Sequence, residues 1–277
     1  MPNFFPNLPF TLGAPSMVYG EDLLENAAIL SGLLDTIEIV LFHTPAQNNL
    51  PSSAEIRELK AIGDKKGTAF TVHLPASLEL AAEEEGQRRA SLAIALEAIR
   101  RFSPLHPGHY ILHLPFSKPT LVPDPDLYYP WKPTLAWAQW EERALPSLHK
   151  IREFLEARDS LLIENINYSP RFLAPFLDAG ICRLCLDLGH LLLGREEIRP
   201  NLEYFFDKTA EIHLHGVDGC REHLSLSKMP SGLVQTIVDF LQQKPFRGLV
   251  NLEVFSPTDL HESLSLVKQA LTIPYFF

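Results

Sequence analysis

The feature that most constrains the fold of this chain is a regular alternation of short β-rich runs with longer helical patterns. Eight runs read as strands, at Leu12–Tyr19, Thr36–Phe42, Ala69–Leu74, Tyr110–Leu114, Leu161–Glu164, Arg183–Leu188, Glu211–Leu214 and Leu249–Phe255. Eight segments with apolar residues at helical spacing lie between or after them, at Asp22–Leu33, Ser53–Lys66, Gln87–Phe102, Thr134–Arg158, Arg171–Asp178, Asn201–Phe206, Gly232–Gln243 and Pro257–Leu271. Ser53, two residues before Glu55, and Thr258 are expected to cap two of these helices.

Alternation of this kind, without a series of hairpin turns, predicts a parallel sheet, and eight units are the number that closes a (β/α)8 TIM barrel. The 277 residues suffice for one such domain spanning 1–277. A doubly wound open sheet is the alternative, but no GxGxxG motif follows the first strand.

Composition favours a cytoplasmic protein that acts on a small molecule. The net charge of −10 disfavours a nucleic-acid partner, whose phosphates require many Lys and Arg contacts. No apolar stretch reaches the ~20 residues that span a membrane, and no basic region followed by an apolar helix opens the chain.

Cys182 and Cys185 lie three apart on a strand and so face opposite sides, which indicates buried, reduced thiols. The oligomeric state is left open.

One connection is too long to be routine. The proline-rich segment Pro115–Pro133 follows the fourth strand and has no periodicity. Its aromatic residues favour a lid over an apolar ligand, with a packed Ω-loop as the alternative. They are Phe116, Tyr128, Tyr129 and Trp131.

Side chains of metal-ligand type stand at or just beyond the carboxyl ends of the last six strands. They are His73, His113, Glu164, Asp187 with His190, His213 with His215 and His223, and Glu253. Because all strand ends of a barrel meet at one rim, we expect these side chains to converge in one pocket.

Imidazole and carboxylate together suit zinc, manganese or iron(II), whereas magnesium prefers oxygen ligands alone. A buried carboxylate without a partner costs on the order of several kcal/mol. No lysine lies at these strand ends to provide that partner, and Arg183 is at the opposite end of its strand. The pattern therefore predicts bound divalent metal ions rather than a structural polar cluster.

Two further positions complete the prediction. Glu38 faces inward by alternation and is expected to accept a hydrogen bond from a ligand histidine. His215 is expected to contact the substrate, as a donor to a phosphate, or to support a ligand. No role is assigned to the histidines in loops and helices, which are His43, His106, His109, His149 and His261.

The order His, His, Glu, Asp-x-x-His, His, His, Glu along strands three to eight resembles the xylose-isomerase-like barrel superfamily. That group includes sugar isomerases and epimerases and the endonuclease IV type of repair enzyme, in which this order supplies a trinuclear zinc site. The resemblance implies the metal ligands His73, His113, Glu164, Asp187, His190, His213, His223 and Glu253. The endonuclease pattern has Asp two residues before the late histidine, where this chain has Arg221, so Asp218 is a substitute ligand or Arg221 holds a phosphate. The resemblance therefore implies two or three divalent metal ions per chain, with zinc or manganese expected in preference to iron.

Longer stretches, among them DTIEIVLFHT, FTVHLPASLEL and EIHLHGVDGCREHLSL, look like the cobamide-remodelling phosphodiesterase family. That resemblance implies cleavage of the phosphoester in the cobamide nucleotide loop, which yields cobinamide and an α-ribazole phosphate-type product. Glu164, Asp187, Glu253 and Arg221 would then be the catalytic residues.

Two other functions remain open. A sugar isomerase or epimerase would need a single metal ion, held by Glu164, Asp187, His213 and Glu253. Such an enzyme would not need His73, His113 and His223 together as ligands. A non-catalytic barrel could bind a corrinoid without cleaving it. Cleavage of abasic DNA is disfavoured by the net charge and by the proline- and aromatic-rich loop.

Overall fold

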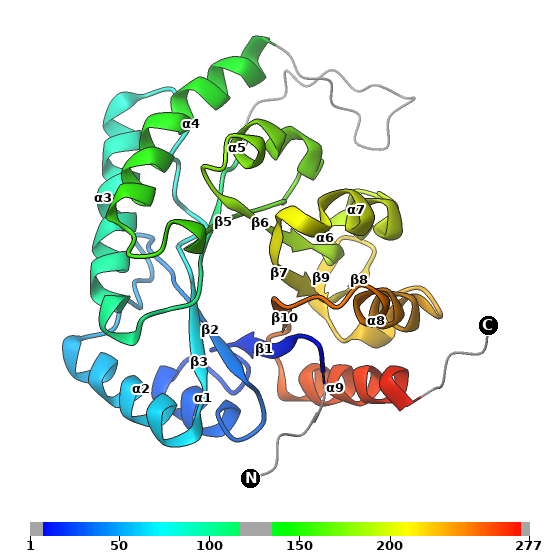
Figure 1. Cartoon of the computed structure of the whole chain (residues 1–277). Helices are drawn as coiled ribbons and strands as arrows, with labels where there is room; N and C mark the ends of the chain where they lie inside the picture. Colours follow the sequence, from blue (N-terminus) through cyan, green and yellow to red (C-terminus); the bar gives the residue numbers. More distant parts are fainter. Residues whose placement is uncertain (1–7, 117–134, 273–277) are drawn as a thin grey trace.

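The computed structural model describes residues 8–116 and 135–272, and these form a closed barrel of eight parallel strands surrounded by helices (Figure 1). Around the barrel the strands run in the order β1, β10, β7, β6, β5, β4, β3, β2. Their bounds are β1 Thr11–Pro15, β2 Thr36–Val40, β3 Ala69–His73, β4 Tyr110–His113, β5 Leu161–Glu164, β6 Arg183–Asp187, β7 Thr209–Leu214 and β10 Leu249–Leu252. The predicted (β/α)8 TIM barrel is confirmed, and most strands end one to four residues earlier than the sequence pattern indicated.

Helices connect the strands and form the outer layer. The helices are α1 Leu23–Leu30, α2 Ser53–Lys66, α3 Glu85–Phe102, α4 Leu135–Phe154, α5 Ala174–Asp178, α6 Leu188–Leu193, α7 Ile198–Phe205, α8 Leu233–Gln243 and α9 Pro257–Thr272. Short 3-10 turns lie at η1 Ser103–Leu105, η2 Arg158–Ser160, η3 Pro170–Leu173, η4 Phe206–Lys208 and η5 Leu226–Lys228. Over residues 8–116 and 135–272, no helix combines the length and the apolar character needed to cross a bilayer.

Two elements at the carboxyl rim are absent from the sequence-based prediction. Helix α6 begins at Leu188, directly after β6, and Asp187 caps it by accepting a hydrogen bond from the His190 backbone N–H at 2.6 Å. The strands β8 Gly216–Asp218 and β9 Arg221–Leu224 form a small antiparallel hairpin after β7. Both elements are too short to leave a periodic signal, and both carry predicted site residues.

The second helix is capped one residue earlier than predicted. Ser52 is the cap of α2: its hydroxyl accepts from the Glu55 N–H, and the Glu55 carboxylate accepts from the Ser52 N–H, forming a capping box. Ser53 is the first helical residue. Thr258 lies inside α9, where the Ser256 hydroxyl instead accepts from the Asp259 N–H at 3.1 Å.

The barrel interior and the helix layer have separate apolar cores. The larger core lies between strands and helices, and a small cluster of Ile111, Leu162, Cys185 and Ala210 is separate from it. Ile111, Leu162 and Cys185 each lie two residues before a predicted metal ligand on β4, β5 or β6, and therefore on the same, inward face. On these three strands the metal-ligand side chains thus stand directly above an apolar floor.

Most of the predicted lid, including Tyr128, Tyr129 and Trp131, falls outside the described residues. Phe116 is described, and it is buried against Trp137 and Trp140 of α4, with ring centroids 4.9 and 5.8 Å away. It packs in this aromatic cluster, between barrel and helix layer, and is not among the residues that line the cavity at the rim.

The capping box provides a test of how α2 begins. We expect Ser52→Ala to lower the free energy of unfolding by about 1 kcal/mol, because the side-chain acceptor for the first turn is lost. Ser53→Ala, one residue along, should change it by less than about 0.5 kcal/mol. Urea denaturation followed by circular dichroism measures both, and equal effects would contradict this assignment of the cap.

Candidate metal centre

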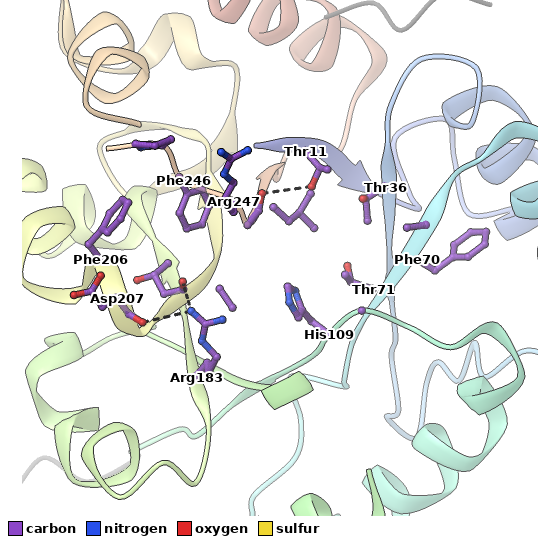
Figure 2. A pocket seen from close by; sticks show the side chains of 17 residues that line it. Thr11, Thr36, Phe70, Thr71, His109, Arg183, Phe206, Asp207, Phe246 and Arg247 are labelled. Atoms are coloured by element: carbon purple, nitrogen blue, oxygen red, sulfur yellow. Dashed lines mark hydrogen bonds between the residues drawn. The ribbon is translucent and has the colours of Figure 1, made fainter. Parts of the chain in front are cut away.

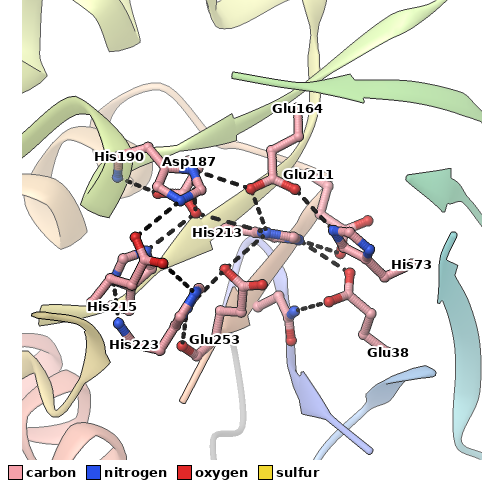
Figure 3. Close-up of polar contacts among 12 residues, drawn as sticks. Glu38, His73, Glu164, Asp187, His190, Glu211, His213, His215, His223 and Glu253 are labelled. Carbon is pink, nitrogen blue, oxygen red and sulfur yellow. Dashed lines mark hydrogen bonds and ion pairs between the residues drawn. The ribbon is translucent and has the colours of Figure 1, made fainter. Parts of the chain in front are cut away.

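The eight predicted metal ligands come together at the carboxyl rim of the barrel. Strands β3 to β7 and the segment after β10 each contribute at least one of them, and α6 and β9 contribute His190 and His223 (Figure 3). Among the described residues, five groups of ligand atoms lie close enough to hold a metal ion, each with all its atoms within 4.8 Å of one another, and three of these groups consist of predicted site residues at the rim. The other two are Glu164, Cys185 and His213, and Glu38, Glu211 and His213.

The first group is His73, His113 and Glu164. Both imidazoles approach the same carboxylate oxygen, with His73 Nε2 and His113 Nε2 each 3.1 Å from Glu164 Oε2. The other nitrogen of His73, Nδ1, donates to the backbone carbonyl of Leu74 at 2.9 Å. That bond leaves Nε2 as the nitrogen with a lone pair to offer a metal.

The second group is Glu164, Asp187, His213 and Glu253. It uses the other oxygen of the shared glutamate: His213 Nδ1 lies 3.6 Å from Glu164 Oε1, 3.3 Å from Glu253 Oε2 and 3.9 Å from Asp187 Oδ2. Glu164 therefore stands between the first two groups and turns one oxygen toward each.

The third group is His190, His215 and His223. His215 Nδ1 accepts from the His223 backbone N–H at 3.0 Å, which places the proton of a neutral imidazole on Nε2, 3.3 Å from Asp187 Oδ2. The Nε2–Oδ2 contact is an ion-pair distance only, because both atoms are buried without a hydrogen-bond partner among the described residues. Gly189 makes the approach feasible, since a Cβ there would lie 2.1 Å from the His215 ring.

The chemistry of the second group fits a metal ion. Glu164 Oε1, Asp187 Oδ2, His213 Nδ1 and Glu253 Oε2 are buried and, within the described part of the chain, have no hydrogen-bond partner. Buried polar atoms are otherwise almost always satisfied, and leaving several carboxylate oxygens unsatisfied side by side is strongly unfavourable. A divalent cation among them satisfies all four atoms at once.

A cavity of about 510 Å³ opens over these groups. Metal-ligand side chains line one part of it, and Met17, Val40, Leu41, Phe42 and Phe255 line an apolar part. Glu222, to which sequence reasoning assigned no role, also lines it and lies 3.7 Å from both His190 Nε2 and His223 Nε2. His223 has a left-handed backbone (φ 56°), a strained conformation for a residue of this type that is most frequent at functional sites.

Arg221 and Asp218 of the hairpin do not reach this cavity. Both are exposed, and neither is among the lining residues. The structure thus places neither the predicted phosphate-binding arginine nor the substitute carboxylate at the rim.

Glu38 lies on the side of His213 that faces away from the rim. Its carboxylate oxygen Oε2 is 3.1 Å from His213 Nε2, and Oε1 accepts from the Asn251 amide at 2.9 Å. A second buried carboxylate, Glu211, stands beside it, with Oε1 3.7 Å from the same imidazole nitrogen. The signal for Glu211 was its spacing: two residues before His213 on β7, it faces inward by alternation.

Burial and mutual contact shift the pKa values of these groups in the metal-free protein. Burial lowers the pKa of His73, but the hydrogen bond and charge of Glu164 outweigh it and raise that pKa from 6.5 to about 9. Burial raises the pKa of Glu164, yet the charges of His213 and His113 hold it well below its usual value. His190 behaves like His73, because Asp187 and Glu164 overcome the effect of burial and raise its pKa.

These shifts predict that metal binding displaces protons. Below pH 6.5 the raised pKa of His73 stabilises the protonated, metal-free protein, and this contribution is lost as pH rises through about 9. Metal affinity should therefore increase by about tenfold per pH unit for each displaced proton across this range. Zinc titration calorimetry in buffers of different ionisation enthalpy counts the protons, and an affinity independent of pH would contradict the assignment of His73.

Comparison with known proteins agrees with the fold. Residues 28–271 match the sequence profile of the xylose isomerase-like TIM barrel family. The structure is similar to D-psicose 3-epimerase from Clostridium cellulolyticum, solved with D-tagatose (16% identity, TM-score 0.71, 94% of this chain and 98% of that one). It is also similar to endonuclease IV from Thermus thermophilus (17% identity, TM-score 0.66, 94% and 98%).

A third similar structure is another protein of Thermus thermophilus, soaked with ZnCl2 (20% identity, TM-score 0.66, 97% and 100%). At these identities the likeness is one of fold. No curated protein matches the sequence. Since the family profile covers most of the chain, including all the metal-ligand groups, the protein belongs to the xylose isomerase-like TIM barrel family.

Proposed function

We propose that the protein is a metal-dependent hydrolase of a phosphoester. The observation that carries this proposal is the position of Glu164, whose two oxygens face two different ligand groups. A carboxylate between two metal sites is the arrangement expected of a binuclear hydrolytic centre. An isomerase with one metal ion would not need His73 and His113 as ligands.

His73, His113 and Glu164 would hold one ion, and Glu164, Asp187, His213 and Glu253 the other. Bound there, zinc or manganese would supply Lewis-acid stabilisation of the phosphate oxygens and lower the pKa of a coordinated water. His215 lies beside Asp187, with Nε2 3.3 Å from Asp187 Oδ2, and Glu38 fixes the orientation of His213. His190 and His223 line the cavity beside this pair of sites and would contact the phosphate or, together with His215, hold a third ion. Glu222, 3.7 Å from both imidazoles, would hold them in their protonated, phosphate-binding form.

As substrate we propose a cobamide, cleaved at the phosphoester of its nucleotide loop. The sequence resemblance to cobamide-remodelling phosphodiesterases supports this choice, as does a cavity that joins a ligand-rich part to an apolar part. The net charge of −10 favours a small molecule over a nucleic acid.

A sugar epimerase is the second candidate. The group Glu164, Asp187, His213 and Glu253 alone would suffice for one ion, and sugar epimerases are among the structurally similar proteins. In that function Glu164 and Glu253 would lie on either side of a ketose, one removing a proton from it and the other returning one.

Removing a predicted metal-binding carboxylate, either the shared Glu164 or Asp187, tests the proposed hydrolytic centre. We expect Glu164→Gln and Asp187→Asn each to reduce turnover by about 1000-fold or more, because metal-ion stabilisation is worth several kcal/mol. Glu58→Gln, an exposed position on α2, serves as the control and should retain full activity. Circular dichroism verifies that the barrel still folds, and near-wild-type rates in either site variant would contradict the proposal.

The substrate is tested by incubating zinc- or manganese-loaded protein with adenosylcobalamin and analysing the products by mass spectrometry. The expected products are a cobinamide and a phosphorylated ribazole. Intact cobamide that binds tightly without being cleaved would indicate a corrinoid-binding barrel instead. Epimerisation of a ketose such as D-tagatose, with no phosphoester cleavage, would favour the second candidate.

A further inference from the structure

We propose that His109 and Glu211 are positioning residues that hold His213 in place as a metal ligand, from the opposite mouth of the barrel. This inference rests on the metal centre of the proposed function, but it assigns a role to two residues outside the three groups at the rim.

The two ring nitrogens of His213 face different surroundings. Nδ1 faces Glu164, Asp187 and Glu253, while Nε2 faces away from the rim toward Glu38 at 3.1 Å and Glu211 at 3.7 Å (Figure 3). The hydrogen bond made by one ring nitrogen sets the tautomer and orientation in which the other binds a metal. Glu38 makes that hydrogen bond, and Glu211 Oε1, a buried oxygen without a hydrogen-bond partner among the described residues, lies close enough to act on Nε2 through its charge.

The two carboxylates are anchored differently. Glu38 is held by the Asn251 amide, inside the barrel. Glu211 is held by His109, whose Nδ1 lies 2.8 Å from Glu211 Oε2. Both glutamates are fully buried, and burying an ionised carboxylate without a hydrogen-bonded partner is strongly unfavourable. Among the described residues, His109 is the hydrogen-bond partner of Glu211 on the side away from His213.

His109 itself lies at the amino-terminal mouth. It directly precedes β4, its side chain is 21% exposed, and it lines a second cavity of about 510 Å³ together with Thr71, Arg183, Asp207 and Arg247 (Figure 2). The series His109, Glu211, His213 thus extends from this cavity to the metal centre at the other end of the barrel. A conformational change at His109 would therefore move the Glu211 carboxylate, which lies beside the imidazole of His213.

A purely structural role makes a different prediction. If the His109–Glu211 pair only satisfies a buried carboxylate, its loss lowers the stability of the metal-free protein and leaves metal affinity unchanged. If the pair positions His213, its loss weakens metal binding. The zinc affinity of the full-length protein separates the two roles.

The experiment measures the zinc dissociation constants of wild type, His109→Gln, Glu211→Gln and the double variant by competition with a chromophoric chelator. We expect each single variant to bind zinc about 10- to 100-fold more weakly, the range usual for residues that orient a metal ligand. The double variant should be no weaker than the weaker single variant, since both act through one contact. His106→Gln is the matched control: His106 lies 3.4 Å from Glu156 but is 70% exposed, and its loss should not alter affinity.

Each outcome decides the proposal. Wild-type affinity in His109→Gln, or additive losses in the double variant, would overturn it. If His109→Gln does not fold, His109→Asn takes its place, since it keeps a shorter donor at the same position. A wild-type protein that binds no zinc would instead overturn the metal centre on which this inference rests, and the two failures are thus distinguishable without measuring turnover.

Discussion

Charge balance inside the barrel is the constraint on which the rest of this structure depends. Glu38, Glu164, Asp187 and Glu211 are fully buried, and imidazoles stand between them. His213 is at the centre of this arrangement, within 4 Å of carboxylate oxygens on five different residues, and it is itself fully buried. Without an added cation, the histidines can neutralise this cluster only by holding protons, which is why the pKa of His73 is raised. A metal ion bound here would replace those protons and satisfy the same oxygens.

The barrel is what makes such a cluster possible. On β4, β5 and β6 the inward residue that precedes each ligand is apolar, so this part of the polar layer is supported from below by Ile111, Leu162 and Cys185. Most of these side chains are set by rigid strands, and Glu253 and His215 lie one residue past the ends of β10 and β7. His190 depends on the cap of α6 by Asp187, and His223 has a left-handed backbone in the β8–β9 hairpin. These two rim histidines are thus placed by short elements, while the two groups that share Glu164 are placed by the barrel itself.

The barrel and the convergence of ligands were predictable because both follow from patterns along single strands. Period-two alternation indicated the inward face, and the strand ends indicated the rim. What the sequence could not provide depends on contacts between distant segments. His109 precedes its strand and reads as an ordinary loop histidine until Glu211, 102 residues later, is found beside it. Phe116 reads equally well as a lid residue or a core residue, and only the positions of Trp137 and Trp140 place it in the core. The tautomer of His215 is set by a backbone N–H of a hairpin too short to be recognised in the sequence.

The central claim is that two metal ions share Glu164, and anomalous diffraction at the zinc absorption edge from crystals of the zinc-loaded protein tests it most directly. We predict at least two anomalous peaks, one among His73, His113 and Glu164 and one among Glu164, Asp187, His213 and Glu253. A single peak, confined to the second group, would contradict it and would leave the one-metal epimerase as the better description of this barrel.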